Sequence, residues 1–141
     1  MTPTALMDAL REQLAAHGLY VKAAAVRLDG DTARLRLGDQ EVTATTEALI
    51  WDGHAHPAEQ VEQVAKLLAD AYTVHVLGWL KSACPGWRHH HDAGAYRATW
   101  LAPVPEQLRQ AGFRAEVAAP NLVTFARELQ EQHMIAHMNG H

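Results

Sequence analysis

Histidine is the residue type whose number and spacing in this sequence could support chemistry, with ten histidines among 141 residues. His133 and His137 lie four residues apart in a segment with a helical period, so both imidazoles can point at one metal ion. The candidates for a third ligand are His141, His89, His90, His91 and Asp92. The sequence therefore predicts, as one alternative, a zinc-binding protein or a zinc-dependent hydrolase in which the ion lowers the pKa of a bound water.

The residues around this pair lack the other parts of a catalytic site. Residues 133–137 read His-Met-Ile-Ala-His, without the Glu that follows the first His in the zinc metalloprotease pattern. Cys84 has no base at a readable spacing, and we expect it to be a small apolar side chain at a helix end. His75 lies on the apolar face of a predicted helix, where we expect a buried, hydrogen-bonded residue. The leading prediction is therefore a protein without catalytic activity, and no cofactor is expected apart from the zinc of the alternative.

Arginines form a second group with a readable arrangement. Arg34 and Arg36 would share the outer face of one predicted strand, and Arg27 would join them from the strand before it. The order helix, three strands, helix is similar in layout to double-stranded-RNA-binding domains, which implies nucleic-acid binding as a third alternative. Those domains carry Lys at the start of their second helix, whereas residues 57–60 here read Pro-Ala-Glu-Gln. The charge of this region therefore disfavours nucleic acid as a partner.

The composition sets the broad class. A net charge of −4 gives no general attraction to nucleic acid or to anionic lipid, and 48% hydrophobic with 20% charged residues is typical of a globular protein. Cys84, the single cysteine, excludes an internal disulfide and is consistent with a reducing compartment. No apolar run is long enough for a membrane span or a signal peptide. We expect a cytoplasmic protein with no membrane partner, and the Ala-rich, Lys-poor composition is typical of a bacterial source.

The elements that must position these residues centre on one long segment, residues 58–84. Its apolar side chains recur at steps of three and four, which predicts a single helix with one buried face. The alternative is a helix that ends near Asp70, followed by a buried strand at residues 72–80, because Tyr, Thr and Val favour strands. In the second half of the helix, Val74 and Leu77 fall on the otherwise polar side. This half therefore carries more apolar surface than one buried face requires, which predicts an additional partner.

The remaining elements follow from period and turn residues. A helix is predicted at residues 3–17 with Thr2 as its cap, then three antiparallel strands between residues 26 and 46, the last of which can continue through Trp51. His56 and Pro57 would begin the long helix. After it the sequence predicts a loop at 85–94, a strand at 96–101, a short helix at 105–112, a strand at 113–118, and a helix at 122–138 capped by Asn121. This is a single α+β domain over residues 1–141, with the order α-βββ-α-β-α-β-α.

A similar order of helices and strands occurs in secretion-chaperone-like folds, including the YbjN-type proteins. That layout implies binding of other proteins and no catalysis. The leading prediction is an adaptor or chaperone-like protein that binds another protein, itself as a homodimer, or both. The predicted contact residues are Val74, Leu77, Trp79 and Trp87, because Trp is enriched in interaction hot spots.

Overall fold

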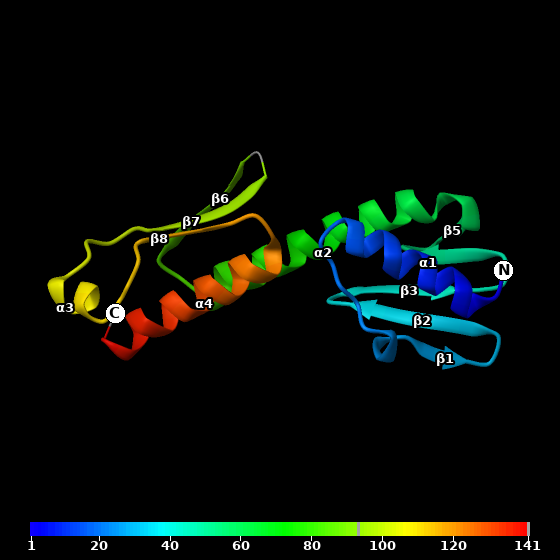
Figure 1. Cartoon of the computed structure of the whole chain (residues 1–141), viewed down its shortest axis with the longest axis horizontal. Helices are drawn as coiled ribbons and strands as arrows, with labels where there is room; N and C mark the ends of the chain where they lie inside the picture. The colour runs from blue at the N-terminus through cyan, green and yellow to red at the C-terminus, as the bar shows by residue number, and fades with distance from the viewer. Residues whose placement is uncertain (93, 141) are drawn as a thin grey trace. The chain divides into compact units, whose positions relative to one another are not determined.

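The structure is a computed structural model that describes residues 1–92 and 94–140. The chain divides into two compact units, Met1–Val76 and Leu77–His141, and each is described by itself. The described residues contain four α-helices and two antiparallel sheets (Figure 1). This confirms the predicted α+β class, with an N-terminal helix, a strand meander, a central helix and a C-terminal helix.

The first helix, α1 (Pro3–Ala16), forms where the sequence predicts it. The side chain of Thr2 caps it, because its Oγ1 accepts a hydrogen bond from the backbone N–H of Ala5 at 3.0 Å. Gly18 follows the helix with a φ of 82°, a conformation that a residue without a Cβ adopts at little cost. The buried face of α1 consists of Leu6, Met7, Leu10 and Leu14. These side chains supply the helical part of the core of the first unit.

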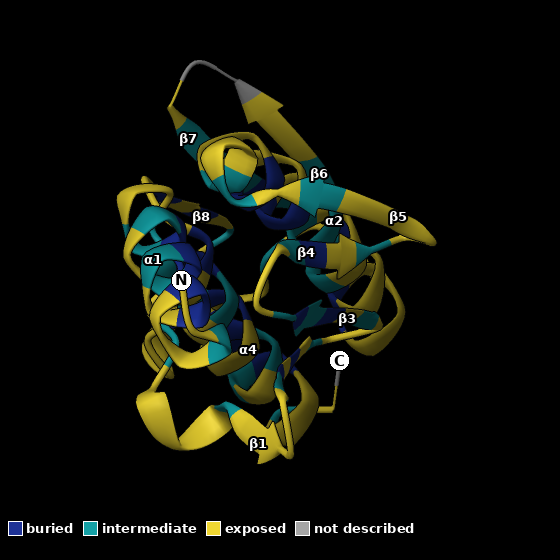
Figure 2. Ribbon diagram, turned by 90° about the vertical axis from the view of Figure 1, so that its right-hand side faces the viewer, coloured by how far each residue is buried: buried dark blue, intermediate teal, exposed yellow. Residues whose placement is uncertain are grey.

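The sheet of the first unit is an antiparallel meander in which each strand pairs with the next. Its strands are β1 (Arg27–Asp29), β2 (Thr32–Leu37), β3 (Gln40–Ala44), β4 (Ala48–Trp51) and β5 (His54–Pro57). Alternate residues of β2 and β3 point into the core, so that Leu35 and Val42 are both buried. β1 is exposed along its whole length, as Figure 2 shows.

β4 and β5 extend the meander beyond the three strands that the sequence predicts. The side chain of Thr45 accepts hydrogen bonds from the backbone N–H groups of Glu47 and Ala48, which turns the chain back after β3. Asp52 and Gly53, with φ values of 54° and 75°, then form a hairpin turn between β4 and β5. The expectation that the helix begins at His56 and Pro57 was wrong, because both residues lie in β5.

The central helix α2 (Val61–Ala83) is continuous, which confirms one helix and excludes the alternative of a strand at 72–80. A short 3₁₀ turn at Ala58–Gln60 precedes it. Its buried residues in the first unit are Val64, Ala65, Leu68 and Ala69. The expectation of a buried His75 was wrong: this side chain is 41% exposed, and its Nδ1 lies 3.6 Å from Oδ1 of Asp39 in the β2–β3 turn.

The second unit has its own antiparallel sheet, with the strand order β6 (Trp87–Asp92), β7 (Ala95–Trp100), β8 (Glu116–Ala119). The predicted loop at 85–94 was wrong, because β6 occupies most of it. The short helix α3 (Glu106–Gln110) and the long helix α4 (Leu122–Met138) complete the unit. The Oδ1 atom of Asn121 caps α4 by accepting a hydrogen bond from the backbone N–H of Thr124 at 2.8 Å, as the sequence predicts.

The core of the second unit is rich in aromatic side chains. Trp87 packs against Trp100 and Phe113, with ring centroids 5.2 and 5.7 Å apart. Phe125 and Leu129 of α4 are almost fully buried.

None of the helices in the described part of the chain is long and apolar enough to cross a lipid bilayer.

Candidate functional site

The four residues predicted to bind a partner have different environments. Val74 and Trp79 are exposed on α2, with 72% and 52% of their surfaces accessible to solvent. Leu77 is half-buried and lines a cavity of the second unit. Trp87 is only 6% exposed. The prediction that Trp87 contacts a partner is therefore corrected: its indole is part of the aromatic core.

A groove of about 320 Å³ lies in the second unit between the end of α2 and the last turns of α4. We call it the α2–α4 groove, and its lining residues are Trp79, Ala83, Cys84, Gln130, His133, Met134 and His137. Trp79 contributes from α2, and Met134, which is 58% exposed, contributes from α4. Large apolar side chains that stay this exposed beside a hollow are typical of interaction sites. Among the residues that the structure describes, the lining includes no Asp, Glu, Lys or Arg.

Two titratable groups of the α2–α4 groove, His133 and Cys84, favour their neutral forms. Burial lowers the pKa of His133 below its ordinary value, and the nearby His137 lowers it further. Burial raises the pKa of the Cys84 thiol, so this side chain stays protonated and weakly nucleophilic. Nδ1 of His133 is buried and has no hydrogen-bond partner within the described residues. The neutral forms of His133 and Cys84 suit the groove to an uncharged surface rather than to a charged ligand.

The predicted metal ligands that the structure describes lie in two different cavities. His133 and His137 share the α2–α4 groove, whereas His89 and His91 line a different cavity. The imidazole of His89 packs edge-on against Phe125, with centroids 6.4 Å apart. Phe125 precedes His133 by two helical turns, or about 12 Å along α4. His89 therefore packs near the start of α4, away from His133.

Across residues 1–92 and 94–140, no group of three His, Cys, Asp or Glu side chains could hold a metal ion. His141, one of the predicted ligands, lies outside the described residues, as does the side chain of Asp92. The zinc site at His133 and His137 stays a prediction.

The three arginines predicted to contact nucleic acid do share one face of the first sheet. Arg27 pairs with Arg34 in register, and Arg36 follows two residues later on β2. Together with Glu41 they line a surface hollow of about 330 Å³. Arg34 forms an ion pair with Asp29 at 3.5 Å, and Glu41 lies opposite Arg36 in the register. Acidic neighbours thus offset part of the positive charge, and nucleic-acid binding stays a prediction.

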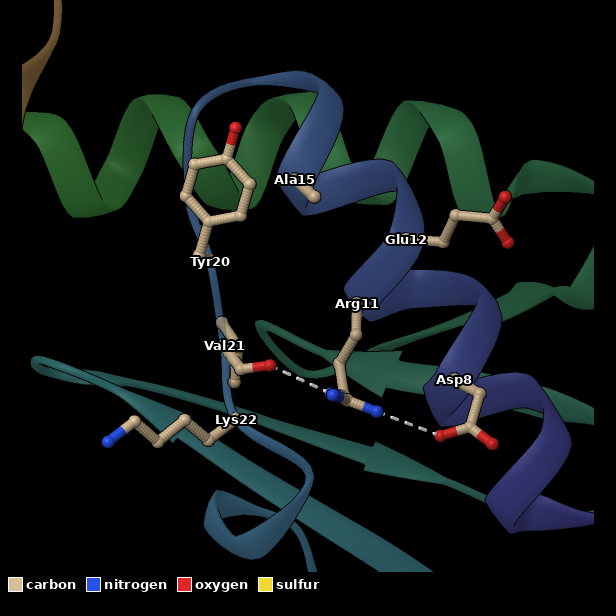
Figure 3. Close-up of a pocket in the computed structure, with 7 residues that line it drawn as sticks. All are labelled: Asp8, Arg11, Glu12, Ala15, Tyr20, Val21 and Lys22. Atoms are coloured by element: carbon tan, nitrogen blue, oxygen red, sulfur yellow. Dashed lines mark hydrogen bonds and ion pairs between the residues drawn. The ribbon is translucent and has the colours of Figure 1, made fainter.

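Sequence reasoning missed a hollow of about 420 Å³ beside α1 (Figure 3). Arg11 extends from α1 toward the segment that follows the helix, where its Nε donates a hydrogen bond to the carbonyl of Val21 at 3.0 Å. Its Nη1 forms an ion pair with Asp8 at 3.1 Å. The guanidinium therefore ties the segment after α1 back to the helix, and its contacts are structural.

Sequence reasoning also missed the cavity that contains Leu77 and His89. Besides Leu77 and the three histidines at 89–91, the residues that line this cavity are Lys81, Tyr96, Arg97 and Phe125. One signal was available, because Leu77 and Lys81 are four residues apart and so lie on one face of α2.

Comparisons with protein-family models, with curated proteins and with solved structures gave no match for this chain.

Proposed function

We propose that this protein is a non-catalytic adaptor that holds an apolar helical segment of a partner protein in the α2–α4 groove. The observation that carries the proposal is the pair Trp79 and Met134, two large apolar side chains that remain exposed beside one hollow. Trp is enriched in binding hot spots, and Met adapts its shape to different apolar partners.

The shape and charge of the groove support a helix as the occupant. Two helices form its walls, and an amphipathic helix laid into an apolar groove is a recurring mode of peptide recognition. The described lining residues include no permanently charged side chain, so the groove matches the apolar face of such a helix. Met138, which is exposed one turn after Met134, extends the apolar surface along α4.

The size of the groove favours an inserted segment over a second copy of the chain. A stable dimer typically buries about 800 Å² on each subunit. A hollow of about 320 Å³ accepts a few side chains, which is the scale of one helical face rather than of a broad flat interface.

The single cysteine supports a reducing compartment, and we propose the cytoplasm as the location of the protein on this basis.

The test uses a synthetic amphipathic peptide with Leu at positions i, i+3, i+4 and i+7, titrated into the full-length protein and followed by NMR. We expect saturable shifts of the Trp79 indole N–H and the Met134 methyl group. Trp79→Ala should weaken binding by about 30-fold, the equivalent of a hot-spot loss of about 2 kcal/mol.

The matched controls are Leu67→Ala on α2 and Val123→Ala on α4, which remove exposed apolar side chains outside the groove. Both should bind the peptide as tightly as the unmodified protein. Sedimentation of the protein alone provides the second arm. A dimer that Trp79→Ala dissociates would make a second copy the occupant and overturn the proposal, and so would the absence of saturable peptide binding.

A further inference from the structure

The second unit contains a second, smaller cavity that shares no residue with the α2–α4 groove. Its volume is about 160 Å³. We call it the histidine cavity, and its lining residues are Leu77, Lys81, His89, His90, His91, Tyr96, Arg97 and Phe125. A cavity of about 150 Å³ is large enough for one benzene ring. The volume therefore fits a ligand built on a single ring.

Aromatic side chains form one side of the histidine cavity. The imidazole of His91 stacks on the ring of Tyr96, with centroids 4.4 Å apart and planes 5° from parallel. The ring centroids of Tyr96 and Phe125 are 5.8 Å apart, and Phe125 also packs against the imidazole of His89. Rings in offset or edge-on contact offer a flat apolar surface on which another ring can pack favourably.

Positive charge lines the same cavity, and the lining residues that the structure describes include no carboxylate. Lys81 contributes an ammonium group that takes part in no ion pair or side-chain hydrogen bond within the described residues. Arg97 also lines the cavity and forms an ion pair with Glu116 at 3.0 Å. An anionic group in the cavity would therefore gain a cationic partner at Lys81.

His89 supplies hydrogen-bonding atoms that lack partners. Its Nδ1 and Nε2 are both buried, and neither has a hydrogen-bond partner within the described part of the chain. Buried polar atoms in proteins are nearly always paired, so two such atoms on one ring beside a cavity indicate a missing acceptor or donor. A neutral imidazole carries one N–H, which can donate to a carboxylate oxygen.

We propose that the histidine cavity binds a small carboxylate that carries one ring. The ring packs against Tyr96 and Phe125, and the carboxylate lies between the ammonium group of Lys81 and an N–H group of His89. The ligand pairs with the N–H group of His89, offsets the charge of Lys81 and fits the volume of the cavity.

The test is a calorimetric titration of the full-length protein with sodium benzoate. We expect one site with a Kd of about 1 mM or tighter. Acetate, which has the charge without the ring, and benzyl alcohol, which has the ring without the charge, should each bind at least about tenfold more weakly. Lys81→Gln should weaken benzoate binding about tenfold, because it removes the cation and keeps most of the side chain.

Lys66→Gln is the matched control, because Lys66 is an exposed lysine on the same helix but outside the cavity. It should bind benzoate as the unmodified protein does. Three results would overturn the proposal: no saturable benzoate binding, equal binding of inorganic phosphate, or an equal loss in Lys66→Gln. None of them bears on peptide binding in the α2–α4 groove, so the two proposals fail separately.

Discussion

Two histidines of the second unit have pKa values below the ordinary value for this side chain. Burial lowers the pKa of His89, and the charge of Lys81 lowers it further. Burial and the neighbouring His137 lower the pKa of His133. In both residues the folded state favours the neutral imidazole, because burial removes the hydration of a charged ring and the neighbouring Lys81 or His137 disfavours its positive charge.

These shifts predict that the free energy of unfolding decreases in mildly acidic solution. In the unfolded chain these histidines have pKa values of about 6.5 and bind protons just below this pH, whereas His89 and His133 of the folded chain remain neutral there. Stability is therefore highest above this pH and decreases as the pH falls through about 6.5 toward the lower folded pKa values. Urea unfolding at several pH values measures the slope.

Replacing His89 and His133 together with Gln should flatten this slope between about pH 7 and pH 5, because the two shifted groups are removed. Met134→Gln serves as the control, since it introduces the same side chain beside His133 without removing a titratable group. An unchanged slope in the double variant would contradict the assignment to these two residues.

At the scale of the elements, the contact between α2 and the β2–β3 turn can be tested with single substitutions. Gly38 in that turn has a φ of 60°. A Cβ added there would lie 2.6 Å from Cδ2 of His75, whereas a Cβ at Gly30, with the same φ, meets nothing within 4 Å. The two glycines thus have matched backbone conformations and differ in whether α2 packs against the turn.

Gly38→Ala should destabilise the protein more than Gly30→Ala. Both variants carry the cost of a positive φ, about 1 to 2 kcal/mol. Gly38→Ala adds about 1 kcal/mol, because His75 must leave its rotamer and its contact with Asp39. Chemical denaturation of both variants, and of each combined with His75→Ala, measures the difference. If the excess persisted without His75, the clash would not be its cause.

At the starts of two helices, residues close together in the sequence were sufficient to predict the structure. Thr2 and Asn121 cap their helices as predicted, since a cap bonds to a backbone N–H only three residues away. β6 escaped prediction because its residues, Trp87 to Asp92, show no simple alternation of apolar and polar side chains. Its partner β7 supplies the hydrogen bonds that make it a strand.

At the scale of the whole molecule, the buried apolar residues form one set in each compact unit. Leu35 belongs to the core of the first unit, and Leu129 to that of the second. The prediction of a single domain requires that the two sets unfold together. Separate sets of contacts allow one unit to lose protection before the other.

Leu35→Ala and Leu129→Ala should each lower the free energy of unfolding by about 2 to 5 kcal/mol, because each leaves a cavity in a core. We expect amide hydrogen exchange to accelerate most in the unit that carries the substitution. Leu67→Ala, at an exposed position of α2, is the control and should change exchange little. Equal acceleration in both units for both variants would instead support a single cooperative domain.

The sequence by itself determined the α+β class, the long central helix, and the caps and turns, because these depend on period, backbone conformation and neighbours within a few residues. Only the tertiary structure decided that Trp87 is buried while Trp79 stays exposed. It also separated His89 from His133, which the sequence allowed to meet at one metal ion. Such outcomes depend on packing between distant segments, which the local pattern does not encode. The α2–α4 groove and the histidine cavity follow from that packing.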